Sequence, residues 1–302
     1  NIYAMSNIEK FLNIIVKYGL YAILLTPLVF WPRALYAFMT PKFILFQMLV
    51  EIVFAAWLVL MIYRNRLTQG IADLRKNYII LVLLGFLAIS FISAVFGIDF
   101  NRSFWGIGAR MTGLFAELHF FAWFLILISI SKSDFLPTRD LPKGDKNSSK
   151  SDFDMVRYLN FSFIVSILVA LSAFFQNTEL RLVYGCTFFN NPTFVAPYFL
   201  FHFFWGLYQF FRSGSTKMWF FGLSAALLAL VIFLGEIRGA ILGLLIGLFV
   251  FGIGLIFSNI INRRYKILLF IFYFLLSLSL MGLWFARESA FVQNTSVLKR
   301  LT

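Results

Sequence analysis

Residues 240 to 260 read AILGLLIGLFVFGIGLIFSNI, a run without a charged side chain. A helix rises about 1.5 Å per residue, so roughly 20 apolar residues cross the ~30 Å hydrocarbon core of a bilayer. Eight further runs meet the same criterion, near residues 11–31, 43–63, 78–96, 114–130, 158–175, 193–211, 218–234 and 267–285. The sequence therefore predicts an all-α, polytopic integral membrane protein with nine transmembrane helices.

The composition of the 302 residues favours the same class: 61% are hydrophobic, 13% are charged and the mean hydropathy is +0.86. An ordinary soluble domain carries roughly 25% charged residues. The formal net charge of +13 would suggest nucleic acid as the partner of a soluble protein. Here the basic residues lie in short gaps between apolar runs, where membrane topology accounts for them. A lipid bilayer is the predicted partner, and nucleic acid is not.

The distribution of Lys and Arg predicts the orientation of the chain. Cytoplasmic loops retain an excess of these residues, and the inner loops hold more of them when the N-terminus is inside and the C-terminus outside. Residues 131–155 are polar, with the run KGDKNSSKSD, and are predicted to form a flexible cytoplasmic loop. Because the chain starts at Asn1, we expect a fragment, in which residues 286–302 begin a truncated periplasmic region.

Two arginines on the predicted outer face are candidates for binding an anion. Arg238 lies in GEIRGA at the start of the eighth span, and Arg110 lies in the glycine-rich residues 104–113 before the fourth. A helix N-terminus offers free N–H groups and a positive dipole end, and the planar guanidinium binds phosphate with two parallel hydrogen bonds. Together these features predict a diphosphate site, although an arginine at the end of a span is also typical of a headgroup anchor.

Other polar residues give weaker indications. Glu51 lies in the middle of the second span, where an ionisable group is either functional or neutralised by protonation or a local partner. Glu117 is placed to orient Arg110, whereas His119 and His202 are predicted to be packed structural side chains. The repeat of Gly239, Gly243 and Gly247 predicts close helix packing. The remaining candidates for supporting substrate contacts are Arg181, Asn190, Asn191 and Glu236.

Several familiar chemical signatures are missing from the sequence. It contains no Walker loop, no HExxH and no Gly-x-Ser-x-Gly. With two histidines and one cysteine, Cys186, the chain is not expected to bind a metal or to form an internal disulfide. No cofactor is predicted, and the catalytic residue is not identified.

Three stretches resemble the O-antigen ligase and polymerase superfamily of bacterial membrane glycosyltransferases. They are SFWGIGARMTGLF at residues 103–115, TFFNNPTF at 187–194 and GEIRGAILG at 235–243. The last is similar to the family's Thr-Arg-Gly-Ala turn, with Ile237 in place of the usual small hydroxyl residue. The order and spacing of the stretches are similar along roughly residues 80 to 260.

The resemblance implies an enzyme of the bacterial inner membrane that transfers a glycan from undecaprenyl diphosphate. The acceptor would be lipid A-core sugar for a ligase, a growing glycan for a polymerase, or a protein for an O-oligosaccharyltransferase. Arg238 would hold the diphosphate with help from Arg110, and no metal is required in the ligases. The family's catalytic histidine belongs to an outer region expected after residue 302, and neither His119 nor His202 matches it.

Two other classes of function remain open at this stage. A transporter or flippase for lipid-linked glycans would use charged groups inside the membrane, for which Lys17 and Glu51 are the candidates. In a scaffold subunit without catalytic activity, the outer arginines would be scattered and would face lipid headgroups.

Overall fold

The structure is a computed structural model that describes residues 7–65, 76–108, 110–131, 153–174, 189, 191–235, 237–257 and 263–285. Within these residues all the regular elements are helices, which confirms the all-α class. The chain divides into two compact units, Asn1–Val169 and Ala170–Thr302. Each unit is described by itself.

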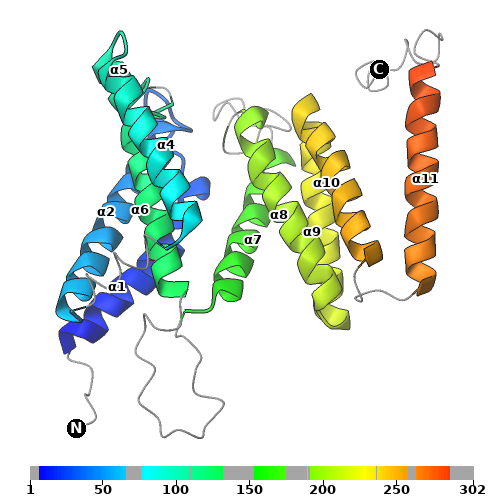
Figure 1. Cartoon of the computed structure of the whole chain (residues 1–302), viewed down its shortest axis with the longest axis horizontal. Coiled ribbons are helices and arrows are strands. Elements are labelled where there is room, and N and C mark those ends of the chain that lie inside the picture. Colours follow the sequence, from blue (N-terminus) through cyan, green and yellow to red (C-terminus); the bar gives the residue numbers. More distant parts are fainter. Residues whose placement is uncertain are drawn as a thin grey trace, which may run out of the picture. The chain divides into compact units, whose positions relative to one another are not determined.

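The first unit is a bundle in which α2, α4 and α6 lie side by side and α1 crosses below them (Figure 1). The small helix α5 lies between α4 and α6. The last helix, α7, continues to the boundary with the second unit. The helices are α1 (Asn7–Ile23), η1 (Thr26–Leu28), α2 (Thr40–Tyr63), α4 (Tyr78–Val95), α5 (Phe100–Trp105), α6 (Leu114–Ser131) and α7 (Met155–Leu171).

The first helix differs from the sequence prediction in its bounds. The run 11–31 was predicted as one span, but α1 starts at Asn7 and ends at Ile23. The reason is Pro27, which disfavours a helical conformation for the residue before it and has no N–H to donate. A single 3-10 turn over Thr26–Leu28 follows instead. A partly buried ion pair joins the start of α1 to the end of α2, with 2.6 Å between Glu9 Oε1 and Arg64 Nε.

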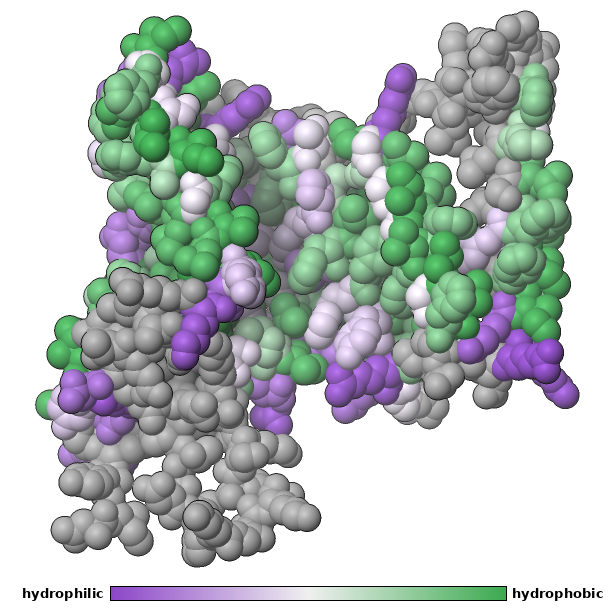
Figure 2. Space-filling view, in the orientation of Figure 1, coloured by the Kyte–Doolittle hydropathy of each residue, from purple (hydrophilic) through white to green (hydrophobic). Residues whose placement is uncertain are grey.

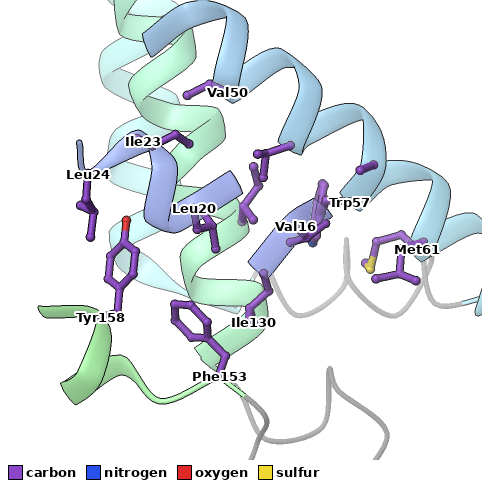
Figure 3. Close-up of a cluster of buried hydrophobic side chains, with 14 of the residues drawn as sticks. Val16, Leu20, Ile23, Leu24, Val50, Trp57, Met61, Ile130, Phe153 and Tyr158 are labelled. Carbon is purple, nitrogen blue, oxygen red and sulfur yellow. The ribbon is translucent and has the colours of Figure 1, made fainter. Parts of the chain in front are cut away.

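The core of the first unit lies where α1, α2, α6 and the start of α7 meet (Figure 3). Leu20 of α1 and Ile126 of α6 are fully buried there. The two helices α1 and α2 approach closely because Gly19 has no side chain: a Cβ at that position would overlap Val53 of α2. The cluster includes Val16, Ile23, Val50, Trp57, Met61, Ile130, Phe153 and Tyr158.

The second unit consists of a helical hairpin and two further helices (Figure 1). Its elements are η2 (Ser172–Phe174), α8 (Pro192–Arg212), α9 (Ser215–Leu234), α10 (Arg238–Phe257) and α11 (Arg263–Phe285). The hairpin of α8 and α9 is tightly packed, and α10 contacts α8, α9 and α11.

The sequence predicts close packing at three glycines of α10, and the structure shows it at two of them. A Cβ at Gly247 would overlap the ring of Phe204 on α8, and one at Gly243 would lie 3.2 Å from Leu200 of the same helix. Gly239 has nothing within 4 Å of a built Cβ, so it is not part of the contact. The packing of α10 against α8 holds the helix that begins with Arg238.

Replacing Gly247 with leucine is expected to destabilise the second unit by about 1–3 kcal/mol, because the added side chain must displace the Phe204 ring from a packed interface. Thermal unfolding in detergent would measure the change. Gly254→Leu is the matched control on the same helix, since nothing lies within 4 Å of a Cβ there. Equal stability of the two variants would contradict the observed contact.

Six helices among the described residues are long and apolar enough to cross a membrane. Large apolar side chains are exposed along their length, and Figure 2 shows hydrophilic residues gathered near helix ends. Exposure of so much apolar surface to water would be unfavourable. The helices therefore require an apolar environment. The structure therefore confirms a multi-pass helical membrane protein in a lipid bilayer. The six are Thr40–Tyr63, Tyr78–Val95, Leu114–Ser131, Met155–Phe174, Thr216–Leu234 and Arg238–Phe257.

Candidate functional site: two arginines and an intramembrane pair

Arg238 is the first residue of α10, and its side chain is exposed. The Ile237 carbonyl accepts the first helical hydrogen bonds, from the N–H groups of Ala240 and Ile241, both at 3.0 Å. Ile237 therefore stands at the capping position, but its apolar side chain cannot accept a hydrogen bond. The guanidinium of Arg238 thus belongs to a helix end whose dipole is positive.

Several other helices close the same end with a polar side chain, whereas α2 and α9 have no side-chain cap. Such a cap accepts a bond from a backbone N–H group that otherwise requires water or a ligand. The side chain of Ile237 cannot supply such a bond to α10, and Glu236 lies outside the described residues. Side-chain caps elsewhere are Asn77 Oδ1, which accepts from Ile79 N–H in α4 (3.0 Å), Asp99 Oδ1 from Arg102 N–H in α5 (3.0 Å), Asp154 Oδ1 from Val156 N–H in α7 (3.0 Å) and Asn191 Oδ1 from Thr193 N–H in α8 (2.9 Å).

Arg110 lies in a loop, residues 106–113, which joins α5 to α6 and closes at its base. A Cβ at Gly113 would overlap backbone atoms of residues 104–106, and one at Gly106 would overlap the backbone of residues 112 and 113. Gly106 also has φ +78°, a conformation that favours glycine. Only glycine fits at both ends of the loop, and Arg110 is exposed between them.

The loop has internal bonds and one attachment to α2. The Ile107 carbonyl accepts hydrogen bonds from the N–H groups of Arg110 (2.8 Å) and Met111 (2.7 Å). The Thr40 hydroxyl at the start of α2 donates to the Gly108 carbonyl at 3.1 Å. The position of Arg110 therefore depends on both the glycines and α2.

The fourth span begins at this loop, but its N-terminus differs from that of α10. Gly113 accepts the first helical bonds of α6, and Glu117 lies in the first turn, where an acidic side chain already interacts with the positive dipole end. The Oε2 atom of Glu117 is buried without a hydrogen-bond partner among the described residues. The role of Glu117 in orienting Arg110 stays a prediction.

A hydrogen-bonded pair joins α2 to α6 inside the predicted membrane region. The Oε1 atom of Glu51 lies 3.1 Å from Nε2 of His119, and Nδ1 of His119 lies 2.6 Å from the Phe115 carbonyl oxygen. His119 is 7% exposed, whereas the Glu51 side chain is 59% exposed. Of the possibilities open for Glu51, the structure shows the local partner. This partner was not predictable from local sequence, because the two residues are 68 positions apart.

The remaining sequence-predicted residues divide into three groups. His202 is buried in α8 and its Nδ1 bonds the Tyr198 carbonyl at 2.7 Å, as expected for a packed side chain. Asn191 caps α8, which occupies its Oδ1 atom. Arg181, Asn190 and Glu236 lie outside the described residues, as do most of the loop 131–155 and residues 286–302.

The described residues contain no group of three His, Cys, Asp or Glu side chains that could hold a metal ion. Arg110 belongs to the first unit and Arg238 to the second. The chain matches none of the known protein families, curated proteins or solved structures with which it was compared.

Proposed function

We propose that the protein is an O-antigen ligase-like glycosyltransferase that transfers a glycan from undecaprenyl diphosphate to an acceptor hydroxyl. The observation that carries the proposal is the exposed Arg238 at a helix N-terminus, directly after Ile237, whose apolar side chain cannot cap the helix. A diphosphate offers two charges and several acceptor oxygens to such a group. The three sequence stretches that resemble the superfamily support the same donor.

The proposed topology has nine spans, with the N-terminus inside and the C-terminus outside the bacterial inner membrane. α1, α8 and α11 then cross in addition to the six helices that meet the length and hydropathy criterion. In this topology α10 begins on the extracytoplasmic face, where lipid-linked glycans are transferred by the ligases that the chain resembles. Arg238 is thereby placed at the donor headgroup.

In the proposed reaction the acceptor oxygen attacks the anomeric carbon of the glycan. The bond from that carbon to the diphosphate breaks, and the lipid diphosphate leaves with the electron pair. Arg238 stabilises the negative charge that develops on the leaving oxygens. The hydroxyl proton passes to a base that is left unassigned.

The acceptor is lipid A-core sugar in this proposal, and a growing glycan or a protein hydroxyl are the alternatives with the same donor. The transporter or flippase alternative depended on Lys17 and Glu51 as groups lining a path. Glu51 has a local partner in His119, and we observe nothing among the described residues that favours transport.

Transfer by the complete gene product in native membranes is expected to require a diphosphate-linked donor and to continue in EDTA. The reasons are the charge that Arg238 recognises and the metal-independence of the ligases that the chain resembles. Radiolabelled glycan transferred to the acceptor would be measured on gels, with the monophosphate-linked glycan as the control donor. Equal use of both donors, or loss of transfer in EDTA, would contradict the proposal.

A further inference from the structure

The Glu51 and His119 pair is a feature that the proposed function does not use. It joins two helices that are each apolar enough to span the membrane, α2 and α6. Ionisable side chains in such helices are costly and are retained when they are neutralised or functional. The protonation state of this pair can be argued from the acceptors around it.

A backbone contact determines where one proton of His119 lies. A carbonyl oxygen can only accept a hydrogen bond, so the 2.6 Å contact between His119 Nδ1 and the Phe115 oxygen requires a proton on Nδ1. The state of the pair therefore depends on Nε2 of His119 and on the carboxyl group of Glu51, which are 3.1 Å apart.

Three proton counts are possible for that contact. With no proton, an imidazole lone pair would face a carboxylate oxygen, and the pair would carry a negative charge. With two protons, an imidazolium would face a carboxylic acid, and the pair would carry a positive charge. With one proton, a hydrogen bond forms and the pair is neutral, whether the proton is bound to the nitrogen or the oxygen.

The surroundings favour the neutral state. His119 is buried, and its ring packs edge-on against Phe115 with 4.4 Å between centroids. Burial of a net charge in an apolar region is costly, whereas a neutral hydrogen-bonded pair avoids most of that cost.

Few other ionisable groups come from the helices that pack against the pair. α4 carries no charged residue over Tyr78–Val95, and η1 carries none. Glu117 is two residues before His119, so it projects from a different side of α6. The other charged residues of α1, α2 and α5 are Glu9, Lys10, Lys17, Lys42 and Arg102.

We propose that Glu51 and His119 form a neutral intramembrane pair that shares one proton between Nε2 of His119 and Oε1 of Glu51. This proposal does not depend on glycan transfer.

Two spectroscopic measurements on the whole chain in lipid nanodiscs at pH 7 count the proton. The ¹⁵N resonances of labelled histidine report whether Nε2 of His119 is protonated. The infrared difference between wild type and Glu51→Gln reports whether Glu51 is a carboxylic acid or a carboxylate. His202 is the internal reference, because it makes the same Nδ1 bond to a carbonyl, and α8, α9 and α10 contain no acidic residue.

Either protonated Nε2 with ionised Glu51, or unprotonated Nε2 with protonated Glu51, supports the proposal. Neutral His119 beside ionised Glu51, or imidazolium beside protonated Glu51, would overturn it. Glu117→Gln is the matched control and should leave the His119 resonances in place.

Discussion

Replacing Arg238 with alanine is expected to lower the rate of glycan transfer by about 100-fold or more, the cost of removing a preorganised donor that stabilises a charged transition state. Arg238→Lys keeps the charge but loses the planar pair of donors, so transfer should be intermediate. Initial rates of the complete gene product, with saturating acceptor, would measure both variants.

The control for this substitution is Arg212→Ala. Arg212 is also an exposed arginine at a helix end, but it closes α8 at its C-terminus and donates to the Tyr208 hydroxyl at 2.8 Å. That end of a helix repels anions, so this variant should transfer at nearly the wild-type rate. Normal transfer by Arg238→Ala, with correct membrane insertion, would remove Arg238 from the mechanism.

Replacing Gly113 with alanine is expected to destabilise the first unit by about 3 kcal/mol or more, at the upper end of single substitutions. The added Cβ would overlap Phe104 O, Gly106 N and Trp105 C, which are all backbone atoms. Backbone atoms cannot turn aside as a flexible side chain can, so the base of the Arg110 loop must open. Unfolding in detergent by heat would show the loss.

A second glycine in the same loop provides the comparison. A Cβ at Gly108 would lie 3.7 Å from the Tyr36 ring, which is ordinary van der Waals contact. Gly108→Ala should therefore unfold at nearly the wild-type temperature. If Gly113→Ala were as stable as Gly108→Ala, the close backbone contact at the base of the loop would be contradicted.

The long helices were predictable because each covers a mostly apolar run, whose length is set by the thickness of the bilayer. Two local features were not predicted. The helix α5 is only a turn and a half long, and its signal was the Asp99 cap rather than hydropathy. The early end of α1 follows from Pro27, which interrupts the helix without interrupting the apolar run.

The candidate site was predictable only where it depends on neighbours in sequence. Arg238 at the start of α10 and the closed loop around Arg110 follow from glycines and apolar runs beside them. The Glu51 and His119 pair depends on how α2 packs against α6, which no local pattern specifies. Tertiary contacts of this kind cannot be predicted from hydropathy.

The most direct test of the central claim is the affinity of this chain, in lipid nanodiscs, for undecaprenyl diphosphate compared with undecaprenyl monophosphate. Native mass spectrometry would measure both lipids on wild type, Arg238→Ala and Arg212→Ala. We expect wild type and Arg212→Ala to prefer the diphosphate, and Arg238→Ala to lose that preference. An unchanged preference in Arg238→Ala would contradict the claim that Arg238 recognises the lipid diphosphate.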